Sequence, residues 1–226
     1  MKSTLPVAII AAGAIVAAAI YISMGGNFAF GNSSTNTDNP ALVRPVDVSD
    51  HILGNPAAPV KIVEYADFDC EYCRSFSNTL HEIIANEGIK GQVAWVYREF
   101  PLTTLHPNAL AAARAAECAA KTGGNDVFWR FADLLFANQP ADPSTFGDLA
   151  ASAGAPADAF ASCYADAANQ VDARIEADSS NAKAVGAEGT PYSLLLAPGA
   201  APIVLDGAYT YDALKQLVDQ AVAKSR

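Results

Sequence analysis

Two cysteines, Cys70 and Cys73, stand three positions apart between a β-branched apolar run, 60–66, and a segment of helical character, 74–80. Cysteines at this spacing can close a small disulfide ring at the start of a helix. The first turn of a helix carries unpaired N–H groups and the positive end of the dipole, which both favour a nearby negative charge. The first cysteine is therefore biased toward thiolate, the form that performs thiol–disulfide exchange.

A more distant pair, Cys118 and Cys163, lies among alanines in helical stretches. Four cysteines allow three pairings. The simplest joins Cys70 to Cys73 as a catalytic pair and Cys118 to Cys163 as a structural disulfide. The alternative for the distant pair is two buried free thiols. Four cysteines in an exported domain point to an oxidising compartment.

Export is indicated by the N-terminal segment, because Leu5 to Met24 contains no charged residue and Lys2 precedes it. A helix of this length spans about 30 Å, the thickness of a bilayer's hydrocarbon core. No small-x-small cleavage site follows, which favours an uncleaved anchor over a cleavable signal peptide. The charge ahead of the segment predicts that the rest of the chain lies outside the cytoplasm.

Composition then divides the chain into three parts. We expect a membrane anchor or signal segment at 1–24, a flexible linker at 25–45 and a folded domain at 46–226, since the linker is rich in Gly, Asn, Ser and Thr. With 51% apolar residues the domain can bury a sizeable core. The net charge of −10 disfavours nucleic acid and anionic lipid surfaces as partners.

The elements that must position the cysteines follow from periodicity and turn residues. A strand at 60–66, a helix at 71–87 and a strand at 92–98 form a β-α-β unit with parallel strands. Five helical segments come next, and Pro198-Gly199 then joins two short strands as a hairpin. The expected helices are 107–122, 126–137, two that begin near Pro143 and Pro156, and 165–184; strands 192–197 and 202–205 and a helix at 210–224 complete the chain. The order predicts an α/β fold: a mixed sheet with helices on both faces and a helical insertion at about 105–186.

Thr190-Pro191 directly precedes the first strand of the hairpin. A functional interpretation is a cis-proline whose loop packs against Cys70 and leaves the preceding backbone free to pair with an extended substrate. The alternative is a proline that only opens a strand, where its missing N–H is tolerated.

Two acidic residues, Glu64 and Glu71, lie near the two cysteines in the sequence. Glu64 lies within the strand at 60–66, where alternation puts it on one face with Ile62 and Ala66. A buried carboxyl there would have a raised pKa and could exchange a proton with Cys73; the alternative is a surface glutamate on an edge strand. Glu71, between the cysteines, should disfavour the Cys70 thiolate, or else it is a water-exposed charge in the first helical turn.

Metal binding is a weaker hypothesis. Thiolates and imidazoles suit zinc, but His51, His81 and His106 are scattered and no second Cys-x-x-Cys is present. We therefore expect no metal site. Trp95 and Trp129 are interpreted as core residues.

The chain from about 51 to 224 resembles the DsbA-like branch of the thioredoxin superfamily, which contains membrane-anchored thiol–disulfide oxidoreductases. The matching stretches are Leu53-Gly54-Asn55-Pro56-Ala57-Ala58-Pro59-Val60, Asp67-Phe68-Asp69-Cys70-Glu71-Tyr72-Cys73, Tyr97-Arg98-Glu99-Phe100-Pro101-Leu102, His106-Pro107-Asn108-Ala109 and Gly189-Thr190-Pro191. The resemblance implies a thioredoxin fold with a helical insertion, Cys70 as nucleophile, Cys73 as its partner, Pro191 in cis and Glu64 as the family's buried acid.

Two positions depart from the family pattern. Many relatives carry proline where this chain has Glu71, and the strongest oxidases carry histidine where it has Tyr72. An imidazolium at the second position would stabilise the thiolate, and Tyr72 cannot. Both differences predict a less oxidising site, because a more stable thiolate means a more stable reduced form.

The sequence thus predicts a membrane-tethered thiol–disulfide oxidoreductase on the periplasmic or cell-surface side. The resemblance implies no cofactor beyond the Cys70–Cys73 disulfide. Its partners would be cysteine-containing exported proteins and a membrane redox-recycling partner. The direction of exchange stays open: the protein acts either as an oxidase or as an isomerase or reductase. The alternative is a non-catalytic binding or chaperone-like module in which Cys70–Cys73 is a structural clasp.

Overall fold

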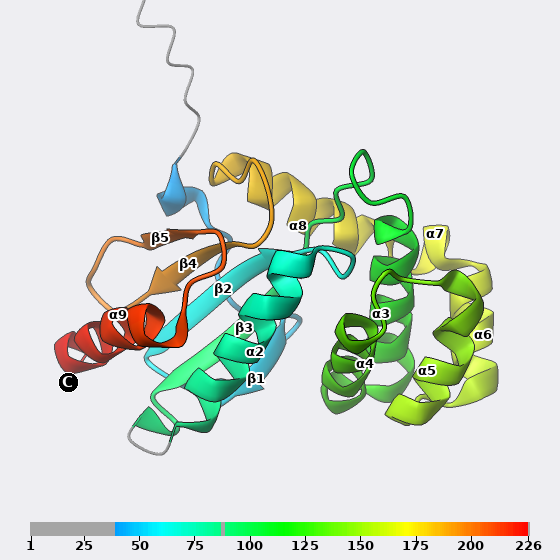
Figure 1. The fold of residues 1–226 in the computed structure, drawn as a ribbon, viewed down its shortest axis with the longest axis horizontal. Coiled ribbons are helices and arrows are strands. Elements are labelled where there is room, and N and C mark those ends of the chain that lie inside the picture. The colour runs from blue at the N-terminus through cyan, green and yellow to red at the C-terminus, as the bar shows by residue number, and fades with distance from the viewer. Residues whose placement is uncertain (1–38, 87–88, 226) are drawn as a thin grey trace, which may run out of the picture. The chain divides into compact units, whose positions relative to one another are not determined.

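The computed structural model describes residues 39–86 and 89–225 of the chain (Figure 1). The anchor predicted at 1–24 and most of the predicted linker lie outside these ranges. Within them, no helix combines the length and the apolar character needed to cross a membrane.

A mixed five-stranded sheet in the order β1-β3-β2-β4-β5 forms the centre of the fold. The parallel strands β2 (Val60–Ala66) and β3 (Val93–Glu99) are joined by the crossover helix α2 (Glu71–Ala85). Strand β4 (Tyr192–Leu196) pairs antiparallel with β2, and β5 (Ile203–Asp206) pairs antiparallel with β4. The predicted β-α-β unit and hairpin therefore share one sheet, and the predicted fold class is confirmed.

The edge strand β1 (His51–Gly54), which pairs antiparallel with β3, was not predicted. Its four residues are too few to show the alternation that marks a strand. Gly54 ends it at a φ of +96°, and a Cβ atom there would stand 3.1 Å from the Val93 carbonyl oxygen. The close approach of β1 to β3 thus requires glycine at this position.

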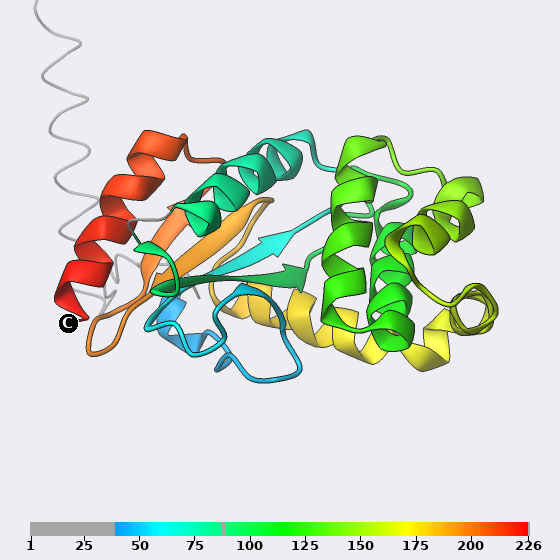
Figure 2. The same cartoon turned by 90° about the horizontal axis from the view of Figure 1, so that it is seen from below.

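Helices cover both faces of the sheet (Figure 2). Helices α2 and α9 (Tyr211–Lys224) lie on one face, and α8 (Asp172–Ala184) lies on the other. The alternation along β2 follows this division, because Ile62 packs in the cluster beneath α2 and α9 whereas Val63 packs in the cluster beneath α8.

The inserted helices pack beside the sheet, between β3 and β4 in the chain (Figure 1). They are α3 (Ala109–Gly123), α4 (Asn125–Ala137), α5 (Phe146–Ala153), α6 (Ala157–Ala165) and α7 (Ala167–Gln170). A disulfide between Cys118 and Cys163 joins α3 to α6. One apolar cluster runs from the α2 face of the sheet into this bundle.

The single helix predicted at 165–184 is wrong, because the structure breaks it into α7 and α8 at Val171. Val171 leaves helical dihedral angles, and its side chain is buried in the core. Lys121 donates a hydrogen bond to the Gln170 carbonyl oxygen at 3.4 Å, next to the break. A 3.6-residue period alone does not reveal an interruption at which the apolar side chains still face inward.

The folded region also begins earlier than predicted. A 3₁₀ helix (Pro40–Leu42) and the residues after it, which we placed in the linker, are bonded to α8. Asn181 accepts a hydrogen bond from the Arg44 N–H at 2.9 Å and donates one to the Leu42 carbonyl oxygen at 2.9 Å. Arg44 also pairs with the buried Asp178 at 2.8 Å. These partners lie more than 130 positions away in the sequence, where local composition gives no sign of them.

The buried guanidinium of Arg98, on β3, holds the same segment in place. Its Nε and one terminal nitrogen donate to the two carboxylate oxygens of Asp50 at 2.9 and 3.0 Å. Arg98 is fully buried and Asp50 nearly so, and such two-point pairing is the geometry in which an arginine–carboxylate pair is strongest.

The disulfide between α3 and α6 should carry a large share of the insertion's stability. It closes a span of 45 residues, for which chain entropy predicts a stabilisation of about 4 kcal/mol. We expect the double variant Cys118→Ala/Cys163→Ala to lose stability of that order in denaturant unfolding. The variant and the protein it is compared with should both also carry Cys70→Ala and Cys73→Ala, so that the two differ only in the Cys118–Cys163 disulfide. Equal unfolding midpoints would contradict this role.

Candidate active site

Cys70 is the N-cap residue of α2, directly after the turn that follows β2. Its N–H donates to the Asp67 carbonyl oxygen at 3.1 Å, and its carbonyl oxygen accepts from the Arg74 N–H at 3.1 Å. Cys73 lies one turn further into the helix, on its inner side. Both are free thiols, unlike Cys118 and Cys163.

Both cysteines are covered by the rest of the fold. Cys70 is only 5% exposed, and Cys73 is fully buried. The segments that contact the Cys70 turn lie far from it in the sequence. The Cys70 thiol donates to the Thr190 carbonyl oxygen at 3.4 Å, and Gln139 donates to the Phe68 and Cys70 carbonyl oxygens at 2.7 and 3.0 Å.

A hydrogen bond from the Cys73 thiol is the main reason why the pKa of Cys70 falls to about 6. Burial opposes the shift, whereas the Thr190 side chain and the backbone N–H groups of Cys73 and Tyr72 support it. Two of these donors belong to the first turn of α2, as the sequence argument requires. Roughly nine-tenths of such a thiol is ionised at pH 7.

The pKa of Cys73 is shifted in the opposite direction, well above its ordinary value. Burial is the main cause, and the hydrogen bond to Cys70 and the nearby Glu64 carboxyl add to it. The pair therefore separates into one thiolate and one thiol, which suits a nucleophile and a partner that keeps its proton.

Glu64 is completely buried on the central strand β2. The alternative of a surface glutamate on an edge strand is therefore wrong. Trp95 donates to Glu64 Oε2 at 2.8 Å, and Oε1 has no hydrogen-bond partner in the structure. Burial raises the Glu64 pKa to about 8, the Trp95 hydrogen bond lowers it, and the charge at Cys70 raises it.

The remaining predicted residues surround the sulfur pair. The Thr190–Pro191 peptide bond is cis, and its loop reaches Cys70 through the Thr190 carbonyl oxygen. Glu71 is the first residue of α2 and is exposed, and Tyr72 is 62% exposed. That Glu71 weakens the thiolate stays a prediction.

Three polar residues at the site were given no role by the sequence. Asp67 is buried and accepts hydrogen bonds from the Asp69 N–H, the Leu102 N–H and His106 Nδ1, each at 2.8 Å. Gln139 fixes the cysteine turn from the insertion. Asp67 and His106 both lie in stretches that carry the family resemblance, but nothing in their spacing shows that they pair.

The histidines do not converge on the cysteines as a metal site would require. His51 pairs with Glu117, His81 with Asp133 and His106 with Asp67. Among the residues that the structure describes, no three His, Cys, Asp or Glu side chains are grouped so as to hold a metal ion.

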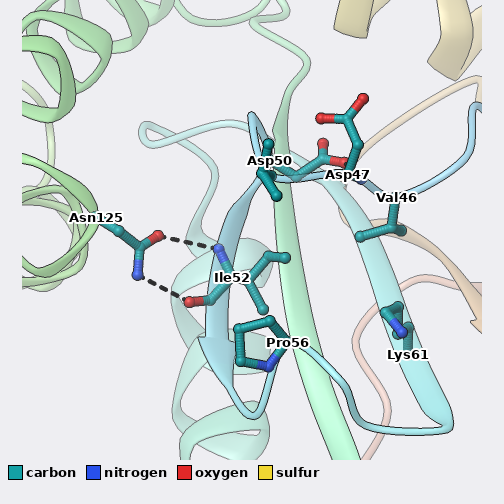
Figure 3. Close-up of a pocket in the computed structure, with 8 residues that line it drawn as sticks. Val46, Asp47, Asp50, Ile52, Pro56, Lys61 and Asn125 are labelled. Atoms are coloured by element: carbon teal, nitrogen blue, oxygen red, sulfur yellow. Dashed lines mark hydrogen bonds between the residues drawn. The ribbon is translucent and has the colours of Figure 1, made fainter.

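A cavity of about 410 Å³ lies on the β1 side of the domain (Figure 3). Asn125 closes one wall by bonding both the N–H and the carbonyl oxygen of Ile52, at 3.1 and 2.9 Å. No site cysteine and no residue bonded to one lines this cavity. A second cleft, between α2 and α4, adjoins the cysteine helix instead and is lined by Arg74, Ser77, Asn78, His81, Glu82, Asp133, Phe136 and Ala137.

The thiol of Cys73 should control the acidity of Cys70. In Cys73→Ala the main donor to the Cys70 sulfur is lost, so the midpoint of Cys70 ionisation should rise from about 6 by about one pH unit or more. The thiolate absorbance of the reduced variant, followed against pH, measures this midpoint. A Cys70→Ser protein supplies the baseline, and a midpoint as low as in the wild type would contradict the assignment.

Glu64 should make stability depend on pH. The folded protein keeps the Glu64 proton up to about pH 8, whereas the unfolded chain loses it near 4.5. Between these values unfolding releases a proton, so stability falls by about 1.4 kcal/mol for each pH unit gained. Glu64→Gln removes this loss and should gain stability over the wild type from about pH 5 to pH 8. Denaturant unfolding of both reduced proteins tests this; a constant difference across the range would refute it.

Three solved structures are among those that share the fold of this chain. BdbD from Bacillus subtilis (oxidised) has a TM-score of 0.67 and 24% identity, covering 80% of this chain and 96% of that one. A thioredoxin-like oxidoreductase from Silicibacter pomeroyi has a TM-score of 0.64 and 27% identity, and the match covers 77% of this chain and 93% of that one. The thiol-disulfide exchange protein alpha-DsbA2 from Wolbachia pipientis has a TM-score of 0.66 and 20% identity, covering 77% and 88%.

Curated relatives carry a different kind of name. A Na⁺/H⁺ antiporter NhaA 1 from Mycolicibacterium gilvum is 35% identical over 154 residues, which are 66% of this chain and 24% of that protein. A second NhaA 1, from Salinispora arenicola, is 34% identical over 190 residues, which are 82% of this chain and 27% of that protein. The chain spans about a quarter of the length of these relatives.

The family assignment rests on a match over most of the folded region. The model of the family described as thioredoxin matches residues 47–220, from the segment before β1 into α9. This range contains both cysteines, the buried Glu64 and the Thr190–Pro191 loop. The chain belongs to the thioredoxin family, and its fold is that of the DsbA-like branch.

Proposed function

We propose that this chain is an exported thiol–disulfide oxidoreductase that exchanges disulfides with folding proteins through Cys70 and Cys73. The observation that carries the proposal is the division of the pair, with a Cys70 pKa near 6 beside a buried Cys73 whose pKa is well above its ordinary value. A structural clasp has no need of one acidic and one inert thiol.

In the oxidising direction, a substrate thiolate attacks Cys70 of the Cys70–Cys73 disulfide. A mixed disulfide forms at Cys70, the bond to Cys73 breaks, and its electron pair leaves on the Cys73 sulfur. A second substrate thiolate then attacks the substrate's sulfur in the mixed disulfide and displaces Cys70 as thiolate. Two electrons pass from the substrate to the pair, and the substrate gains a disulfide; the reverse sequence reduces or isomerises.

Glu64 is suited to supply the proton that Cys73 needs as it leaves. The Glu64 carboxyl is buried with a pKa of about 8, so it holds a proton at neutral pH. Its charge contributes to the raised pKa of Cys73, which indicates that the two groups lie within electrostatic reach. A protonated acid beside a buried leaving thiolate lowers the barrier to its departure.

The pKa of Cys70 indicates whether the pair oxidises or reduces its substrates. Its pKa of about 6 lies between roughly 7 for thioredoxin and about 3.5 for DsbA. Because a stable thiolate stabilises the reduced form, the pair should oxidise substrates more readily than thioredoxin and less readily than DsbA. We therefore favour passage of the disulfide onward to substrates, followed by reoxidation by a membrane partner.

Export and tethering form part of the same proposal. The disulfide between Cys118 and Cys163 supports an oxidising compartment, where such bonds persist. The uncharged segment Leu5 to Met24 would hold the domain at the membrane, on its periplasmic or cell-surface side. Proteins with cysteines that are still folding there are the proposed substrates.

Substitution of the two cysteines separates the proposal from the inert alternative. Cys70→Ser should abolish both oxidation and reduction of a model dithiol peptide, because the attacked sulfur is lost. Cys73→Ala, mixed with the disulfide form of the peptide, should accumulate mixed disulfides visible on non-reducing gels. Cys70 attacks the peptide disulfide and releases one peptide thiolate, and no Cys73 thiol remains to resolve the product. Unchanged exchange by Cys70→Ser, or no labelling of either thiol by iodoacetamide in the folded reduced protein, would favour a structural clasp.

A further inference from the structure

A histidine from outside the Cys-x-x-Cys segment is hydrogen-bonded to the turn that carries Cys70. His106 lies in the connection between β3 and α3, and its Nδ1 is 2.8 Å from the Asp67 carboxylate. Asp67 belongs to the turn that carries Cys70, since its carbonyl oxygen accepts the Cys70 N–H at 3.1 Å. One residue therefore holds the histidine with its side chain and the nucleophile with its backbone.

Further hydrogen bonds make this arrangement rigid. The Asp67 carboxylate also accepts the Leu102 N–H at 2.8 Å, which fixes the start of the connection that carries His106. Two positions after the histidine, Asn108 donates to the Ala141 carbonyl oxygen at 2.8 Å. The Ala141 N–H in turn donates to Asp69, the residue before Cys70. His106 and Cys70 are thus joined through two independent sets of contacts.

The charges around His106 favour its protonated form. Burial lowers its pKa, but the hydrogen bond to Asp67 and the charges of Asp67, Cys70 and Asp69 raise it above the ordinary value. These groups all belong to the cysteine turn; the contacts that the insertion makes there, through Gln139 and Ala141, are neutral. The histidine is a quarter exposed, so its ring also reaches solvent.

Electrostatic coupling between two groups is reciprocal. If a thiolate at Cys70 stabilises the imidazolium of His106, the imidazolium stabilises the thiolate by the same free energy. In this chain the position before the second cysteine is Tyr72, which carries no positive charge. The connection between β3 and α3 supplies a histidine to the turn instead.

We propose that His106, held by Asp67, stabilises the Cys70 thiolate across the turn through the charge of its imidazolium form, as a positioning and electrostatic residue for the exchange reaction. This inference rests on the proposed function and adds a specific residue to it. The same charge stabilises Cys70 when it departs from a mixed disulfide, so it favours release of oxidised substrate.

Reciprocity gives a test that needs no substitution. The pKa of His106, followed by NMR in the wild-type protein, should be higher with the pair reduced than with the Cys70–Cys73 disulfide formed. The expected difference is about 0.5–1 pH unit, because oxidation removes the thiolate charge. His81, which pairs with the exposed Asp133, should not change. Equal values for His106 in the two redox states would overturn the proposal.

Substitution supplies the second test. Asn at 106 places an amide N–H near the position of Nδ1, so His106→Asn can keep the bond to Asp67 while it removes the charge. The Cys70 thiolate should then titrate about 0.5–1 pH unit higher, with a matching fall in its alkylation rate below pH 7. His81→Gln is the matched control and should leave the midpoint unchanged. An unshifted midpoint in folded His106→Asn would refute the role of His106 yet leave exchange through Cys70 intact; loss of the proposed function would appear instead as normal exchange by Cys70→Ser.

Discussion

The interaction of the Cys73 thiol with the Cys70 sulfur is the main cause that lowers the pKa of Cys70, and the chemistry of the site depends on it. The two residues differ in their place on the helix, because Cys73 lies on the buried side of α2 whereas Cys70 is its N-cap residue. Burial raises the pKa of the Cys73 thiol well above its ordinary value, and its hydrogen bond is the main cause that lowers the pKa of Cys70 to about 6. The burial of α2 against the sheet thereby sets the chemistry of the pair.

The helical insertion also helps to hold the cysteine turn in place. Phe68, just before the cysteines, packs against Tyr97 on β3 and Phe136 on α4, at ring-centroid distances of 4.9 and 5.1 Å. Gln139 donates to the carbonyl oxygens of Phe68 and Cys70 and so ties the insertion to the cysteine turn. Sheet, cysteine turn and insertion therefore form one packed unit, and the nucleophile lies where they meet.

Local signals in the sequence predicted the strand–helix unit that carries Cys70 and Cys73, the mixed sheet, and the placement of Glu64 within the strand at 60–66. They failed where the structure depends on distant partners. Neither the short strand β1 (His51–Gly54) nor the break at Val171 follows from periodicity, because only pairing with β3 or packing in the core specifies them. The low exposure of Cys70 and its link to His106 likewise depend on loops that the fold brings together.

Cys70 should be a thiolate at neutral pH, and the rate at which iodoacetamide alkylates it in the reduced wild-type protein measures this. Followed against pH, the rate should reach half its maximum near pH 6, the pKa that the Cys73 hydrogen bond produces. A rate that rises only around pH 8.5, as for an unperturbed thiol, would contradict the account.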